Sequence, residues 1–302
     1  MTSLDHKSRK KRKKSDALLI LAIIVLFLIG AGVMVYPDVA SWLASRSHAG
    51  LVRQYQYEVD DLPNEEIIKH FERAHIYNQS LIGGAIEDPF VVGSGVVIPN
   101  DYYEILNFRN TMGMIEIPVI DVNIPIYHGT GEEVLKRGVG HIPVTPFPIG
   151  QAGKHAVLTG HTGIPTSRLF TDLELLEIGD IFIVSVLNER MAYEIDEINV
   201  VLPHEISNLR SFPDQDLVTL VTCTPYAINS HRLLVRGHRV PYVENMVENM
   251  EVLVTYLNWR FILIAGISSL FILGWLIAAI KNKKKKRSFD DEYNDMLHRG
   301  AL

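Results

Sequence analysis

The chain has 302 residues but only one cysteine, Cys223. A single thiol cannot form an internal disulfide bond, and it cannot contribute to a zinc site built from several cysteines. The sequence also lacks a glycine-rich phosphate loop, the HExxH spacing of zinc peptidases and any internal repeat. We therefore expect no cofactor and no metal ion.

Basic residues are scarce in the central part of the chain. Residues 1–16 and 281–302 each contain seven Lys or Arg residues, which leaves 15 basic and 29 acidic residues between these two tails. An acidic central region excludes nucleic acid as a partner, because binding to phosphates requires a basic surface.

Two long runs contain no charged residue. Residues 17–36 and 261–280 are each apolar over the length that an α-helix needs to cross a bilayer. Each basic tail borders one of these runs, so both tails should stay in the cytoplasm and the region between the runs should lie outside the cell. The alternative for the first run is a cleaved signal peptide. Its apolar core is longer than usual for one, so we favour an uncleaved anchor.

The region between the runs is expected to begin with helices and to continue with strands. Helices are predicted over 38–60 and from Glu65 towards Tyr77, with Asn64 as the N-cap of the second. Four apolar residues of the second helix should pack on the main domain: Ile67, Ile68, Phe71 and Ala74.

Strands are predicted from residue 114 onward. The first stretch, IEIPVIDVNIPIYH, is expected to be broken at Pro118 and Pro125. Later strands are predicted over 156–159, 181–186, 191–201, 217–222 and 232–235, and a short helix over 169–176. Strands at this density indicate a barrel or a sandwich.

Cys223 ends a β-branched apolar run, and a polar loop then leads to a second run that begins at Arg232. Two such runs form a hairpin, which would place these two residues side by side. A thiolate beside a fixed guanidinium is suited to acyl transfer, because the sulfur attacks a carbonyl and the cation stabilises the oxyanion. The alternative is a buried structural cysteine with a solvated arginine.

His161 is the histidine that best serves such a thiol. An apolar run delivers it to the loop TGHTG, whose small residues leave the imidazole accessible. Because imidazole titrates near about 6.5 and a thiol near about 8.5, the two can share a proton at neutral pH. His231 is the rival, but in the predicted strand it would point away from the face that carries Arg232.

These residues together resemble a known family. The segment TLVTC, with Arg232 nine residues after Cys223 and TGH upstream, is similar to the sortases, the membrane-anchored cysteine transpeptidases of Gram-positive bacteria. The similarity runs from about 115 to 240. The second apolar run with its basic tail, and Asp88-Pro89-Phe90 between glycines, resemble the class C, or pilus-assembling, sortases. From the residues alone, an ordinary turn is the favoured interpretation of this glycine-flanked segment.

The resemblance implies an eight-stranded closed β-barrel with N-terminal helices and two flanking transmembrane helices. Cys223 would cleave an LPXTG-type sorting signal between Thr and Gly, His161 would act as acid and base, and Arg232 would hold the substrate and its oxyanion. A lysine amine of a pilin would then resolve the thioester. Asp88, Pro89 and Phe90 would form a lid over the site. Thr162 stands where relatives often have arginine, a position that we expect to lie apart from the chemistry.

The resemblance and the composition together predict seven segments. They are a cytoplasmic tail (1–16), a transmembrane helix (17–36), a helical region (37–105) with the lid (83–95), the barrel (106–243), a juxtamembrane segment (244–260), a second transmembrane helix (261–280) and a second cytoplasmic tail (281–302). Three alternatives remain: a sortase that anchors proteins to peptidoglycan, a hydrolytic cysteine peptidase, and a non-catalytic membrane receptor.

Overall fold

The computed structural model describes residues 3–81, 98, 101–164, 167–209, 211–244, 266–268 and 274. The chain divides into two compact units, one formed by Met1–Tyr36 with Thr255–Leu302 and the other by Pro37–Val254. The second unit contains the β-sheet and the residues predicted to carry the chemistry, so the site is built within it.

Two long helices precede the sheet. Helix α1 covers Ser3–Asp60 and continues through Pro37. Within the described residues, it supplies the one helix that is long and apolar enough to cross a membrane. The second predicted span, 261–280, lies almost entirely outside the described residues.

Helix α2 covers Asn64–Ser80, and its start corrects one prediction. Pro63, not Asn64, occupies the N-cap position, and no side chain caps the helix. Asn64 is already inside the first turn, where its side chain cannot accept the hydrogen bonds that an N-cap accepts. Ile67, Phe71 and Ala74 pack on the core as predicted, but Ile68 is 57% exposed because it lies on the outer side of the helix.

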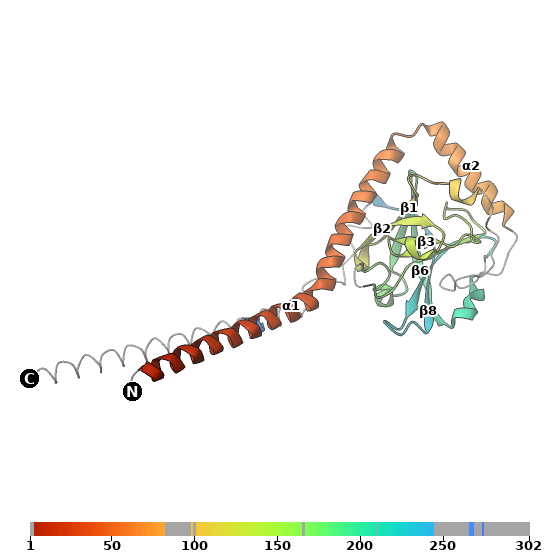
Figure 1. Cartoon of the computed structure of the whole chain (residues 1–302). Helices are drawn as coiled ribbons and strands as arrows, with labels where there is room; N and C mark the ends of the chain where they lie inside the picture. Colours follow the sequence, from red (N-terminus) through yellow and green to blue (C-terminus); the bar gives the residue numbers. More distant parts are fainter. Residues whose placement is uncertain are drawn as a thin grey trace, which may run out of the picture. The chain divides into compact units, whose positions relative to one another are not determined.

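Eight strands close into a barrel, as predicted from the resemblance (Figure 1). They are β1 Thr111–Ile117, β2 Val122–His128, β3 Val139–His141, β4 Lys154–Thr159, β5 Ile181–Val186, β6 Glu189–Val201, β7 Asp216–Thr224 and β8 His231–Val240. Their order around the barrel is β1-β2-β3-β4-β7-β8-β6-β5. Strands β4 and β7 are parallel neighbours, and β7 and β8 form an antiparallel hairpin.

The structure differs from the predictions at one strand, β2, and at one short helix. Pro118 ends β1 as expected, but Pro125 lies inside β2. At Pro125 the strand pairs with β1 alone, since its pairing with β3 begins at Ile126, and a proline is tolerated where one side of a strand has no partner. The helix predicted over 169–176 is only the single turn η3, Leu173–Leu175.

Candidate active site

Cys223 and Arg232 are directly paired across the β7–β8 ladder, which confirms the predicted hairpin. Cys223 lies one residue before the end of β7, and Arg232 is the second residue of β8. Their side chains are 8% and 7% exposed. The pairing therefore holds a thiol and a guanidinium on the same face of the sheet, at the end of the barrel.

The loop between the two strands fixes the guanidinium. Arg232 Nη1 donates hydrogen bonds to the carbonyl oxygens of Asn229, at 3.2 Å, and His231, at 3.1 Å. Two residues of this loop, Ala227 and Asn229, have left-handed backbone angles, with φ of 65° and 58°. The loop is therefore tightly wound, and the carbonyls of Asn229 and His231 orient the guanidinium.

His161 is carried to the same end of the barrel by β4. In the parallel ladder Thr159 pairs with Val221, and the amide of Gly160 donates to the carbonyl of Val221 at 3.1 Å. Continuing this register by two residues brings His161 level with Cys223. The three residues predicted for the chemistry are thus held by three adjacent strands: Cys223 lies on β7, Arg232 on β8, and His161 two residues past the end of β4.

A pair of threonines ties the His161 loop to the strand of Cys223. Thr222 Oγ1 donates to the carbonyl of Gly160 at 2.7 Å and lies 2.6 Å from Thr162 Oγ1. Both neighbours of His161 are therefore held by the residue that precedes Cys223. From the sequence, Thr162 was expected to lie apart from the chemistry, because a single threonine in a loop of small residues provides no signal for such a contact.

Two charged side chains influence His161. Burial lowers the pKa of His161, the carboxylate of Glu132 opposes this by raising it, and the ammonium of Lys136 lowers it further. Glu132 and Lys136 form their own ion pair at 3.0 Å, at helix α3, Glu132–Leu135. Burial, the largest of these effects, favours the neutral imidazole, which is the form that can accept a proton.

The face of the sheet that carries Cys223 also carries an apolar cluster. Side chains alternate along β7, so that Val218 and Leu220 belong to the large core inside the barrel and Val221 belongs to a second cluster. We call this second cluster the outer apolar cluster; it consists of Ile142, Val157, Leu209, Val221 and Leu234, with Val144 and Val201 packed against it. Its five buried members include Val221 and Leu234, which pair with each other two residues along the ladder from Cys223 and Arg232.

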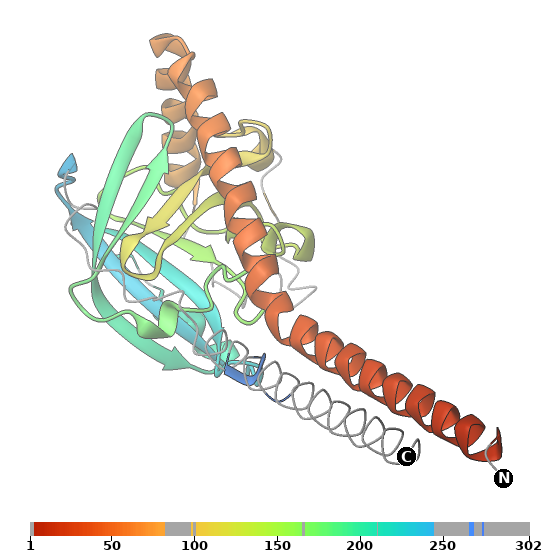
Figure 2. The same cartoon turned by 90° about the vertical axis from the view of Figure 1, so that its left-hand side faces the viewer.

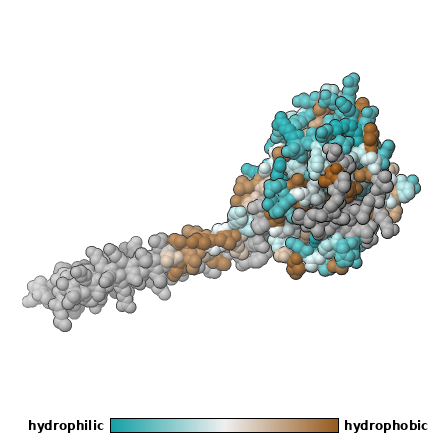
Figure 3. Space-filling view, turned by 45° about the vertical axis from the view of Figure 1, so that its right-hand side comes forward, coloured by the Kyte–Doolittle hydropathy of each residue, from teal (hydrophilic) through white to brown (hydrophobic). Residues whose placement is uncertain are grey.

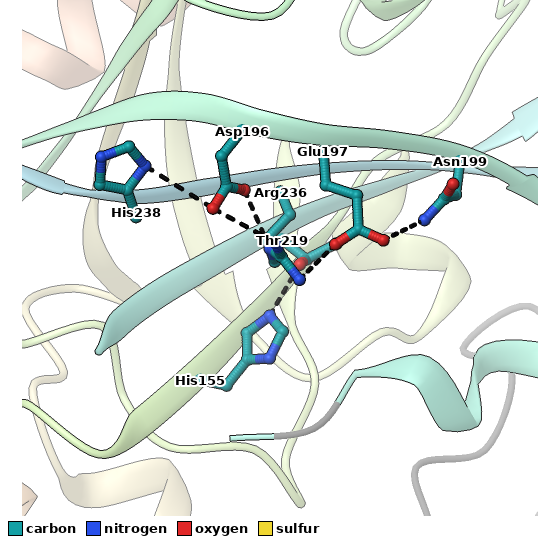
Figure 4. Close-up of polar contacts among 7 residues, drawn as sticks. All are labelled: His155, Asp196, Glu197, Asn199, Thr219, Arg236 and His238. Carbon is teal, nitrogen blue, oxygen red and sulfur yellow. Dashed lines mark hydrogen bonds and ion pairs between the residues drawn. The ribbon is translucent and has the colours of Figure 1, made fainter. Parts of the chain in front are cut away.

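Farther along the same strands, an ionic network occupies the outer face (Figure 4). Arg236 pairs with Asp196, with Nε–Oδ1 at 2.9 Å, and also with Glu197. The register of β6 against β8 shifts between Ile195 and Glu197, and this bulge lets two successive carboxylates reach one guanidinium. The guanidinium of Arg236 is thus held by two carboxylates of β6, whereas Arg232 is paired with Cys223.

The remaining predicted residues lie apart from this group. His231 pairs with Thr224, and its Nδ1 lies 2.9 Å from Ser230 Oγ, so it is adjacent to Arg232 in sequence but on the opposite side of the strand. Asp88, Pro89 and Phe90 lie outside the described residues. Among the residues that are described, no group of three or more His, Cys, Asp or Glu side chains is placed to hold a metal ion.

Comparisons with known proteins agree with this geometry. Residues 115–240 match the family described as "Sortase domain". The crystal structure of sortase C-1 from Streptococcus pneumoniae is 44% identical, with a TM-score of 0.61; the match covers 64% of this chain and all of that one. A second structure of Streptococcus pneumoniae sortase C, described as informative on catalysis and pilin substrate specificity, is 37% identical with a TM-score of 0.60, covering 64% of this chain and 97% of that one.

The curated relatives match over a shorter part. Sortase A of Streptococcus agalactiae is 31% identical over 116 residues, which are 37% of this chain and 47% of that protein. The chain therefore spans about half the length of this relative. The family match over residues 115–240 contains β4, β7 and β8, together with His161, Cys223 and Arg232.

Proposed function

Because this chain belongs to the sortase family, with class C sortases among its structural neighbours, we propose that it is a membrane-anchored transpeptidase that joins pilin subunits. Its donor substrate would be a surface protein with an LPXTG-type sorting signal. Its acceptor would be a lysine amine of another pilin. The observation that carries this proposal is the pairing of Cys223 with Arg232, with His161 in the loop that directly follows the neighbouring strand β4.

In the first half of the reaction, the thiol of Cys223 gives its proton to the neutral His161, and the sulfur attacks the carbonyl carbon of the scissile peptide bond. Arg232 stabilises the negative charge that develops on the carbonyl oxygen. His161, as the imidazolium, donates its proton to the departing amine. The products are a thioester on Cys223 and a released C-terminal fragment.

In the second half, the lysine amine attacks the thioester carbonyl. His161, now neutral, accepts a proton from the amine, and the sulfur of Cys223 departs as the new amide bond forms. Burial of His161 supports this step, since it keeps the imidazole neutral near neutral pH.

An amine-trapping assay tests the proposal. The full-length protein is incubated with an LPXTG-type peptide, with and without an added amine. We expect the amine to become amide-bonded to the threonine. Release of only the free acid, at a rate that the amine does not change, would instead identify a hydrolytic peptidase.

The proposed topology places both tails in the cytoplasm and the barrel outside. The basic flanks of 17–36 and 261–280 support it. Protease added to cells without their wall should digest the barrel region and spare both tails. Cleavage of either tail from outside would contradict the two-span topology.

A further inference from the structure

Helix α1 touches the barrel at two sites that are two helical turns apart, both within the unit Pro37–Val254. His48 is 7% exposed and is hydrogen-bonded to the backbone of Arg137. Tyr55 is 6% exposed; its hydroxyl donates to the carbonyl of Met112 at 3.1 Å and accepts from the amide of Leu187 at 2.8 Å. These contacts fix the direction in which α1 runs along the barrel (Figure 2).

The first contact lies at the end of the barrel that carries the thiol, which we call the catalytic end. In the antiparallel ladder of β3 and β4, Gly140 pairs with Thr159, so that Gly138 falls opposite His161. Arg137 directly precedes Gly138. The neighbouring Lys136 is near enough to His161 for its charge to lower the pKa of that imidazole.

The second contact lies at the opposite end. Leu187 is in the turn between β5 and β6. Strand β6 starts from this turn, pairs Ala192 with Val240, and only at its far end pairs Val201 with Arg232. Following the chain away from residue 37, α1 therefore meets the catalytic end first and the opposite end about 10 Å later, at 1.5 Å per residue.

The segment of α1 before His48 has an apolar face that does not contact the barrel. Val39, Trp42 and Leu43 are 46%, 52% and 57% exposed, and the guanidinium of Arg46 lies 4.0 Å from the Trp42 ring. At 100° per residue, these four side chains fall within one arc, on the opposite side of the helix from His48 and the other barrel-facing residues. Figure 3 shows apolar surface along the described part of α1.

An exposed stripe of this kind, with tryptophan and arginine, is typical of a helix at the interface between lipid and water. It also follows, within the same helix, directly on residues 17–36, the run predicted to cross the membrane. A lipid surface therefore accounts for both its composition and its position in the chain.

We propose that the catalytic end of the barrel faces the outer surface of the membrane, with Val39, Trp42 and Leu43 in the lipid headgroup layer. This inference rests on the proposed membrane anchoring. Trp42 and His48 are six residues apart, which is about 9 Å along a helix. The thiol would then receive its donor close to the lipid surface, not at the far side of the barrel.

The length of the chain after β8 is compatible with this orientation. Val240 lies at the opposite end of β8 from Arg232, so the orientation requires residues 241–260 to be long enough to span the barrel. Residues 241–260 supply a reach of up to about 66 Å at 3.3 Å per residue, which exceeds the length of the barrel strands.

A distance measurement tests the orientation, and the single native cysteine makes it direct. In the full-length Cys223→Ala protein, one new cysteine is placed at the catalytic end, Lys136→Cys, or at the opposite end, Ala152→Cys. Ala152 is exposed and lies just before β4, whose first residue, Lys154, pairs with Asp216 at the far end of β7. Each thiol is labelled with the same fluorophore, and the protein is inserted in vesicles that carry a headgroup-linked acceptor.

We expect strong energy transfer from position 136 and weaker transfer from position 152. Equal transfer, or the reverse order, would overturn the orientation. Glu133→Cys, whose native side chain is 91% exposed, replaces the first reporter if Lys136→Cys does not fold. The unaltered protein is assayed for transpeptidation in matching vesicles. If the protein is active but the order of energy transfer is equal or reversed, only this inference is wrong. If the order is as expected but the protein does not catalyse transpeptidation, only the proposed function is wrong.

A second readout uses Trp42. With Trp259→Phe and Trp275→Phe, it becomes the only tryptophan of the chain. Its fluorescence should be quenched by lipids brominated near the headgroup, and Trp42 should remain unquenched in detergent without brominated lipid. Absence of quenching in the brominated vesicles would contradict the placement of the stripe in the headgroup layer.

Discussion

Cys223 and Arg232 are opposite each other in an antiparallel ladder, one residue from the end of one strand and one from the start of the next. Their proximity is set by the register of the hairpin, since a shift by one residue would turn every side chain of a strand to the other face. The pairing of a thiol with a cation is therefore built into the backbone of the sheet.

Arg232→Lys should lower kcat/KM by about a hundred-fold, the usual order for the loss of an oxyanion donor. Lysine keeps the charge but loses the planar fork that the loop carbonyls of Asn229 and His231 orient. Arg236→Lys is the matched control on the same strand, and it should retain most activity because Arg236 pairs with Asp196. Steady-state kinetics that rank the two variants equally would show that Arg232 supplies only general charge.

Thr222→Val should reduce kcat by roughly ten- to a hundred-fold with little change in KM, because it releases the His161 loop from the strand of Cys223. Thr222→Ser keeps the hydroxyl and should restore most of the rate. Thr219→Val is the control: it also removes a buried hydrogen bond on β7, to His155 at 2.7 Å, but far from the loop. If Thr219→Val lowers kcat as much as Thr222→Val, the threonine pair has no special positioning role.

Glu132→Gln and Lys136→Gln should shift the pH–rate profile in opposite directions. The carboxylate of Glu132 raises the pKa of His161 and the ammonium of Lys136 lowers it. Removal of the carboxylate therefore moves the limb that reports His161 to lower pH, and removal of the ammonium moves it to higher pH. Profiles of kcat/KM measured at low salt check this, and shifts of the same sign would exclude the electrostatic explanation.

Asp88→Ala combined with Phe90→Ala should speed thiol labelling of Cys223 and cleavage of a sorting peptide. The predicted lid would pair Asp88 with Arg232 and place the ring of Phe90 against the sulfur, so its loss should open the site. Glu87→Ala removes a neighbouring charge outside the motif and serves as the control. Identical labelling rates in all three proteins would reduce the segment to an ordinary turn.

Much of the barrel follows from local patterns in the sequence. The β-branched run before Cys223 and the run after Arg232 define a hairpin without any tertiary information, and the loop between them sets its register. Strand β3 could not be recognised in this way, since three residues are too few to show a period. The prediction for Asn64 was wrong because it depends on the residue at which α2 starts. The prediction for Pro125 was wrong because it depends on which strand lies beside it.

Only those site residues could be predicted whose type and immediate sequence neighbours indicate their chemistry. A lone cysteine, a histidine in a small-residue loop and an arginine after a strand are recognisable from their neighbours. The hydroxyl pair of Thr162 and Thr222 and the charges near His161 come from separate segments, so they emerge only when β4, β7 and α3 are brought together.

The most direct test of the account is the mass of the full-length protein after brief incubation with an LPXTG-type peptide. We predict a single adduct equal to the acyl part up to threonine, attached to Cys223 and lost when an amine is added, with the matching amide appearing in solution. Cys223→Ala should show neither adduct nor amide. Formation of the amide by Cys223→Ala, or an adduct on any residue other than Cys223, would contradict the assignment of this thiol as the nucleophile.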